Sequence, residues 1–123
     1  MSAKLTLNTR DELLLIDLDR VAYMQADGNY TQIHYLADNR MVVSIGMSRM
    51  EALVESAMHA NGGNTFVRIG RSLLINQRYL HHVSLTHQRL VLSDGFGHRH
   101  ELAVSKGLLK DYKDTFTKQL KSR

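Results

Sequence analysis

Turn-forming residues divide this chain into short segments, and this division restricts the fold more than any other feature of the sequence. Asp-Gly, Asp-Asn and Asn-Gly-Gly sequences favour tight turns, because glycine and asparagine tolerate the positive φ that such turns need. These turns begin at Asp27, Asp38, Asn61 and Asp94. Most segments between them are short and alternate apolar with polar residues, which is typical of strands. The sequence therefore predicts a mainly β, antiparallel architecture.

The alternation also indicates where the strands lie. In residues 30–36, Thr31, Ile33 and Tyr35 fall on one face, and the even-numbered residues fall on the other. Residues 17–19 form a linker or a single helical turn. The pattern predicts strands at 4–9, 21–26, 30–36, 79–86, 89–93 and 98–104, with short apolar runs at 13–16 and 41–43.

Two segments have helical spacing instead. Ser48 and Glu51 match a capping box, in which each side chain satisfies a free backbone N–H group at a helix start. Ser105 is a suitable N-cap for a second helix. The first helix would bury Met50, Leu53, Val54, Ala57 and Met58, with its methionines as core residues, and would end at Asn61-Gly62-Gly63. The second would bury Leu108, Leu109, Tyr112, Phe116 and Leu120.

The composition is typical of one globular domain. The chain has 123 residues, of which 43% are hydrophobic, so it can bury a core. It contains no cysteine, and therefore no disulfide, thiolate metal site or cysteine nucleophile. It has no secretory pattern at its start and no apolar run of membrane-spanning length. We therefore expect a soluble, cytoplasmic protein that does not contact a membrane.

Positive charge is concentrated near the C-terminus. The formal net charge is +4, and the chain from Lys106 onward contains six lysines and arginines against two aspartates. The remainder of the chain is therefore neutral overall. A basic element on a neutral body favours a directed contact with a polyanion, whereas the alternative is a solvated, lysine-rich helix face.

The residue types that carry catalysis do not occur in the required patterns. His98 and His100 share a strand face, but no further ligands accompany them as a zinc site requires. No serine lies in a nucleophile-elbow pattern, and no P-loop lysine follows the two adjacent glycines Gly62 and Gly63. We therefore expect no enzyme activity, no metal or other cofactor, and no small-molecule substrate.

Nucleic-acid binding is better supported, by an arginine segment and two further elements. Residues 66–76 read FVRIGRSLLIN, so that Arg68 and Arg71 lie three residues apart among apolar residues. A fixed guanidinium fork matches phosphate oxygens or the major-groove edge of guanine, although both arginines could instead be solvated. Asn29 and Tyr30 at a hairpin tip could reach bases. The helix start at Ser105-Lys106 could bind a phosphate through backbone N–H groups.

Three sequence motifs resemble the LytTR (LytR/AlgR-type) DNA-binding domain of bacterial transcription regulators. They are DRVAYMQADGNYTQIHYL at residues 19–36, FVRIGRSLLIN at 66–76 and V-S-K at 104–106. Their order and spacing agree with that family, and the similarity extends from about Leu13 to Tyr112. The resemblance implies an elongated arrangement of small antiparallel sheets with one packed helix and a C-terminal helix. Loops, in place of a recognition helix, would enter successive major grooves and bend the DNA.

The resemblance also implies which residues contact DNA. The hairpin contact falls at Asn29 or Tyr30, the second loop contributes Arg71 and its neighbour Ser72, and the third contributes Ser105 and Lys106. Arg68 and Lys110 are the implied phosphate contacts. Two positions differ from the family pattern. Gly70 stands where many members carry histidine, and Lys106 stands where arginine is usual, so the third loop keeps its charge and loses the bidentate fork.

Family members often carry a phosphorylation-receiver domain or a membrane segment, and this chain has neither. We therefore expect residues 1–123 to form a single DNA-binding domain, either a stand-alone, response-regulator-like protein or an excised domain. The leading hypothesis is a sequence-specific binder of double-stranded DNA that occupies direct repeats as a homodimer or as two copies. One alternative is a protein-interaction module that sequesters a related regulator. Another is single-stranded RNA binding through Tyr30 and Phe96.

Overall fold

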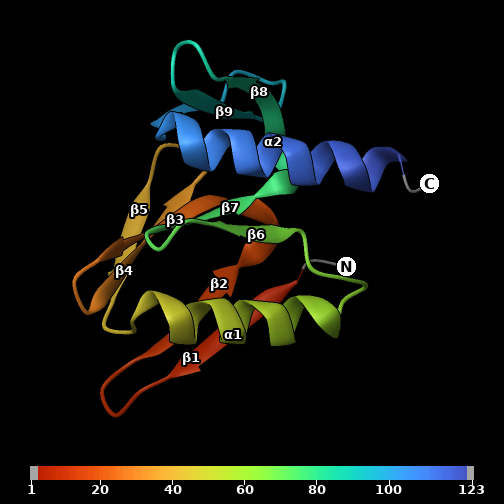
Figure 1. Ribbon diagram of the computed structural model, residues 1–123. Helices are drawn as coiled ribbons and strands as arrows, with labels where there is room; N and C mark the ends of the chain where they lie inside the picture. Colours follow the sequence, from red (N-terminus) through yellow and green to blue (C-terminus); the bar gives the residue numbers. More distant parts are fainter. Residues whose placement is uncertain (1–2, 122–123) are drawn as a thin grey trace. The chain divides into compact units, whose positions relative to one another are not determined.

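The computed structural model describes residues 3–121 and divides the chain into two compact units (Figure 1). The first unit extends to Arg78, and the second begins at Tyr79. A 3₁₀ helix, η2 (Gln77–Tyr79), contains the boundary between the two units.

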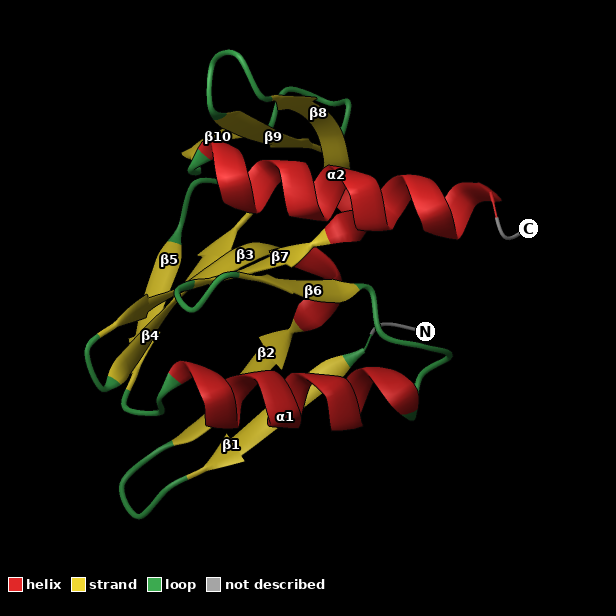
Figure 2. Ribbon diagram, in the orientation of Figure 1, coloured by secondary structure: helices red, strands yellow, loops and turns green. Residues whose placement is uncertain are grey.

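The first unit combines a small hairpin, a five-stranded sheet and one helix, α1 (Met47–His59) (Figure 2). The antiparallel sheet has the strand order β5-β4-β3-β7-β6, and β1 and β2 form a separate antiparallel pair. A 3₁₀ helix, η1 (Leu18–Arg20), connects the two sheets. The strands are β1 (Lys4–Asn8), β2 (Leu13–Asp17), β3 (Val21–Asp27), β4 (Tyr30–Tyr35), β5 (Arg40–Val43), β6 (Phe66–Ile69) and β7 (Leu73–Asn76).

The core of this unit lies where α1, the β1–β2 hairpin and one face of the five-stranded sheet meet. The alternation of β4 is confirmed, because Thr31 and Ile33 are fully buried whereas Tyr30 is 50% exposed. The methionines of α1 are also core residues, as the helical spacing predicts. The cluster contains Leu5, Leu7, Ile16, Leu18, Val21, Met24, Ile33, Val43, Met47, Met50, Val54, Met58, Phe66 and Leu74, together with Ala3.

The predicted capping box of α1 is wrong. The helix begins at Met47 with Gly46 at the N-cap position, and no side chain bonds to the free backbone N–H groups there. Met50 N instead donates to Gly46 O over 3.0 Å. Ser48 therefore lies inside the first turn, where it cannot act as the N-cap, and Glu51 is free for another partner.

The arginine segment, to which the sequence analysis assigned no secondary structure, is a β-hairpin. Phe66 pairs with Asn76 and Ile69 with Leu73, so that β6 and β7 flank a turn at residues 70–72. Phe66 and Leu74 belong to the core cluster of the unit, and Ile69 and Ile75 are buried as well. The apolar residues of this segment are therefore core residues, as expected.

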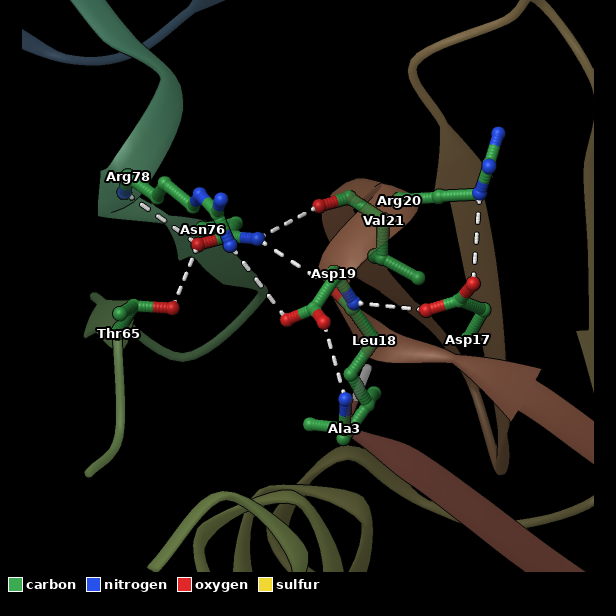
Figure 3. A network of polar contacts seen from close by, with 9 residues as sticks. All are labelled: Ala3, Asp17, Leu18, Asp19, Arg20, Val21, Thr65, Asn76 and Arg78. Carbon is green, nitrogen blue, oxygen red and sulfur yellow. Dashed lines mark hydrogen bonds and ion pairs between the residues drawn. The ribbon is translucent and has the colours of Figure 1, made fainter. Parts of the chain in front are cut away.

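Asn76 connects the end of this hairpin to η1 through its side chain (Figure 3). The residue is 1% exposed. Its Nδ2 donates to Val21 O over 3.0 Å and to Leu18 O over 3.4 Å. Its Oδ1 accepts from Thr65 Oγ1 over 2.7 Å and from Arg78 N over 3.3 Å. One buried amide thus satisfies polar groups of three separate segments and connects β7 to the start of β3.

The second unit is a three-stranded antiparallel sheet with a helix, α2 (Lys106–Lys121). Its strand order is β10-β9-β8, formed by β8 (Leu80–Ser84), β9 (Arg89–Ser93) and β10 (Arg99–Ala103). Ser105 directly precedes α2, and its carbonyl accepts from Leu109 N over 3.0 Å, so the predicted N-cap position is confirmed. Leu109 and Tyr112 are buried as predicted, and burial raises the pKa of Tyr112 to about 12. The predicted burial of Leu108 and Leu120 is wrong, because these side chains are 40% and 53% exposed.

The predicted fold class is confirmed: the described chain is mainly β, with several small antiparallel sheets and two α-helices. The observed strands agree with the predicted ones apart from shifts at their ends and the additional β6–β7 hairpin. Residues 17–19 also match, because η1 is a single helical turn whose Asp19 N donates to Asp17 Oδ1 over 3.3 Å.

We predict that Asn76→Ala lowers the free energy of unfolding by about 3 kcal/mol, because the change leaves several buried polar groups without a partner. Chemical denaturation measures this difference. Asn8→Ala is a matched control, since Asn8 is exposed in β1, and it should change stability by less than about 0.5 kcal/mol. Equal stabilities of the two variants would contradict a structural role for the Asn76 side chain.

Candidate nucleic-acid interface

The pairing of β3 with both β4 and β7 brings two of the three predicted contact loops together. Asp27 pairs with Tyr30 across the β3–β4 turn, and Gln25 pairs with Leu73 at the start of β7. Ala26 N extends this second pairing by donating to Ser72 O over 2.8 Å. The β3–β4 turn and the β6–β7 turn therefore lie next to each other at one end of the five-stranded sheet (Figure 1).

The β3–β4 turn presents its two predicted contact residues to solvent. Gly28 adopts φ +61°, which reverses the chain at the predicted position. Asn29 is exposed, and Tyr30 is half exposed. Behind them, Gln32 Nε2 donates to Asp27 Oδ2 over 3.1 Å, which ties the turn to the exposed face of β4. The hairpin tip is thus a fixed support for an amide and an aromatic ring.

The β6–β7 turn presents Arg71 and Ser72, which are both exposed. Gly70 has φ +64°, so the backbone before Arg71 uses a conformation that glycine adopts without strain. The carbonyl oxygen of Arg71 accepts from Arg68 Nη2 over 2.5 Å. The backbone of Arg71 is therefore fixed by a side chain, while its own guanidinium faces solvent.

Arg68 has a second partner on α1. Its Nη1 donates to Glu51 Oε1 over 2.7 Å, and its side chain is only 22% exposed. The guanidinium thus joins the helix to the turn that carries Arg71. The sequence did not indicate Glu51 as a site residue, because its spacing from Ser48 matches a capping motif. The predicted phosphate contact of Arg68 stays a prediction, and these two protein contacts already occupy part of its donor capacity.

The third predicted contact group belongs to the second unit. Ser105 and Lys106 are exposed at the start of α2, where the first N–H groups of a helix favour an anion. Lys110 Nζ lies 3.2 Å from Asp114 Oδ2, and the lysine side chain is 65% exposed. Such a surface ion pair is weak, so Lys110 can exchange this partner for a phosphate. The gathering of all three contact groups on one surface stays a prediction.

The other polar side chains of the described residues form no metal site and one notable hydrogen bond. No three potential metal-ligating side chains come together within residues 3–121. In the β9–β10 turn, Asp94 accepts a hydrogen bond from His98 Nδ1 over 2.5 Å, and this bond and one from Phe96 N lower the pKa of Asp94.

Within residues 3–121, neither α-helix is long and apolar enough to cross a membrane.

Comparisons with known proteins identify the family and the fold of this chain. The family model described as the LytTr DNA-binding domain matches residues 11–117. A solved structure from Bacillus cereus, described as the LytTr DNA-binding domain of a methyl-accepting/DNA response regulator, has a similar fold with a TM-score of 0.59. It is 20% identical, and the match covers 93% of this chain and 96% of that one. A comparison with curated proteins found no match. Because the family model spans most of the sequence, this protein belongs to the LytTr DNA-binding domain family, whose members bind DNA in transcription regulators.

Proposed function

We propose that this protein regulates transcription in bacteria by binding double-stranded DNA at specific sequences, with its loops inserted into successive major grooves. One observation carries the proposal. The β3–β4 and β6–β7 turns lie side by side on a rigid sheet, and the second turn exposes Arg71 while its backbone is fixed. A residue that reads bases must be exposed and preorganised in this way, because ordering a mobile side chain on DNA costs free energy.

Each contact residue has a role that follows from its chemistry. Arg71 donates two parallel hydrogen bonds to the O6 and N7 atoms of a guanine, and Ser72 supports the contact from the same turn. Asn29 reads an adjacent base through its amide, or Tyr30 contacts it through its ring. In the second unit, Ser105 and Lys106 bind at the start of α2, and Lys110 contacts a phosphate. Two copies occupy direct repeats.

Arg68 acts mainly as a positioning residue in this proposal. The Glu51 carboxylate orients the Arg68 guanidinium, which then holds the carbonyl of Arg71. Any phosphate contact by Arg68 would use the donors that remain. The carboxylate of Glu51 opposes DNA binding by its charge, so its benefit to binding must come through the geometry of the turn.

We predict that Arg71→Ala costs about 1–3 kcal/mol on the preferred duplex, because it removes a bidentate base contact, and relaxes sequence preference. The preferred duplex is selected from a random pool, and electrophoretic titration measures affinity for it and for random DNA. Arg10→Ala, in the exposed β1–β2 turn, removes the same charge and should spare the preference. Equal losses on both DNAs for Arg71→Ala would exclude base reading.

For Lys110→Ala, we expect affinity to fall by a similar factor on every duplex sequence, because a phosphate contact carries no sequence information. The slope of log affinity against log salt concentration should decrease in magnitude by about 0.9, which corresponds to one phosphate contact. Titration at a series of salt concentrations measures this slope. Lys4→Ala is the control with an unchanged slope, and an unchanged slope for Lys110→Ala would remove Lys110 from the interface.

The proposed role of Glu51 gives an unusual prediction for Glu51→Gln. The change removes a negative charge, which by itself would strengthen binding to DNA. We nevertheless expect binding to the preferred duplex to weaken by about 1 kcal/mol, because Arg68 loses the charged partner that orients it. Glu55→Gln, one turn further along α1, removes the same charge from an exposed residue.

Affinity measurements on these two variants separate the effect of geometry from that of charge. Weaker binding by Glu51→Gln together with equal or stronger binding by Glu55→Gln supports the positioning role. If both variants bind more tightly, the Arg68–Glu51 contact does not support the interface.

The same titrations test the alternative functions, since preference for single strands would favour RNA binding. Failure to bind any duplex at low salt would favour sequestration of a related regulator.

A further inference from the structure

The β8–β9 turn, residues 85–88, adjoins the start of α2 within the second unit. Val104 N donates to Gln88 O over 3.1 Å, and Arg89 pairs with Ala103 directly before this contact. Only Ser105 then separates Val104 from Lys106. The turn therefore lies beside the third predicted DNA contact, although the sequence motifs that resemble the family do not include it.

Gln88 holds an unfavourable backbone conformation in this turn. Its φ is +49°, and within residues 3–121 the only other non-glycine residue with positive φ is Asp38. Aspartate occurs at such positions fairly often, because its short side chain bonds locally, whereas glutamine has no such preference. Six other positive-φ positions in the described chain are glycines. Glycine would adopt the same backbone conformation without strain. The fold alone therefore does not explain why residue 88 carries a side chain.

Hydrogen bonds hold the backbone of the turn, but within residues 3–121 no hydrogen bond or ion pair of the Gln88 side chain explains the strain. His87 N donates to Ser84 Oγ over 3.1 Å, and Gln88 N donates to Leu85 O over 3.2 Å. Thr86, His87 and Gln88 are all exposed. Strain that persists at an exposed, well-fixed position indicates a function outside the fold. A carboxamide offers one donor and one acceptor group, which together match the major-groove edge of adenine.

We propose that the β8–β9 turn is an additional DNA contact in which Gln88 reads an adenine next to the site of Lys106. The inference rests on the proposed function, because it assigns a further base contact to the same interface. The partly exposed Arg89 follows Gln88, and its Nη1 lies 3.6 Å from Glu101 Oε2, so the strand after the turn is also fixed. Gln88 would thereby recognise a base beside Lys106, whose ammonium group supplies charge without a bidentate fork.

The variant Gln88→Gly tests this contact without damaging the fold. Glycine relieves the backbone strain, so thermal unfolding should show unchanged or higher stability. Affinity for the selected duplex should nevertheless fall about tenfold, whereas affinity for random duplex should not change. Asp38→Gly is the matched control, because it relieves the same strain in the β4–β5 turn and should cause no loss of affinity.

Base analogues locate the contact. Replacing each adenine of the selected duplex in turn by 7-deazaadenine removes the N7 acceptor and nothing else on that edge. One such replacement should weaken binding by the wild-type protein and leave binding by Gln88→Gly unchanged, which is the coupling expected of a direct contact. A merely structural role for Gln88 would give no such coupling.

The outcomes separate this inference from the proposed function. If Gln88→Gly binds the selected duplex as tightly as the wild type, or loses affinity equally on random DNA, Gln88 reads no base. Loss of specific binding by Arg71→Ala would then still support the proposed function. If the wild type prefers no duplex over random DNA, the proposed function itself fails, and the additional contact fails with it.

Discussion

The antiparallel pairing of β3 with β7 is the constraint on which the candidate interface of the first unit depends. These strands are separated by more than forty residues of sequence, yet Gln25 and Leu73 are direct partners. The hydrogen bond from Ala26 N to Ser72 O carries the pairing into the β6–β7 turn. Without it, Asn29 and Arg71 would belong to two independent hairpins. The Asn76 amide reinforces the same pairing from the opposite end of β7, where it reaches Val21 O.

The Arg68 guanidinium connects α1 of the first unit to the exposed β6–β7 turn. A partly buried cation is tolerated only with good partners, and Glu51 and the Arg71 carbonyl supply them. Its Nε is nevertheless buried and has no hydrogen-bond partner among residues 3–121, which is a cost that a solvated arginine would avoid. The arrangement is therefore a poor choice for stability alone. It makes sense if the precise position of the turn matters more than the free energy of folding.

Local sequence patterns predicted most of the fold, because turns and strands depend mainly on neighbouring residues. Gly28 and the Asp38 turn lie where the glycine and aspartate patterns place them, and β4 buries the face that its alternation predicts. The capping box failed because Ser48 and Glu51 satisfy the motif spacing wherever the helix begins, and the helix begins two residues earlier than the motif requires. The partner of Glu51 is seventeen residues away, and no local pattern specifies such a contact. The exposed Arg71 was predictable from sequence, but its fixed backbone was not.

In two of the turns, a glycine takes the positive-φ position, so that the neighbouring residue can carry a functional side chain. Gly28 and Gly70 adopt the left-handed conformation in their turns. Asn29 and Arg71 therefore have negative φ, which a residue with a side chain adopts without strain. Each turn thereby separates the residue that bends the chain from the residue that contacts DNA in the proposed function. The β8–β9 turn does not make this separation, because Gln88 both bends the chain and carries a functional group. In the proposed additional contact, Gln88 supplies a carboxamide that can distinguish one base pair from another, whereas Lys106 carries charge without a guanidinium fork.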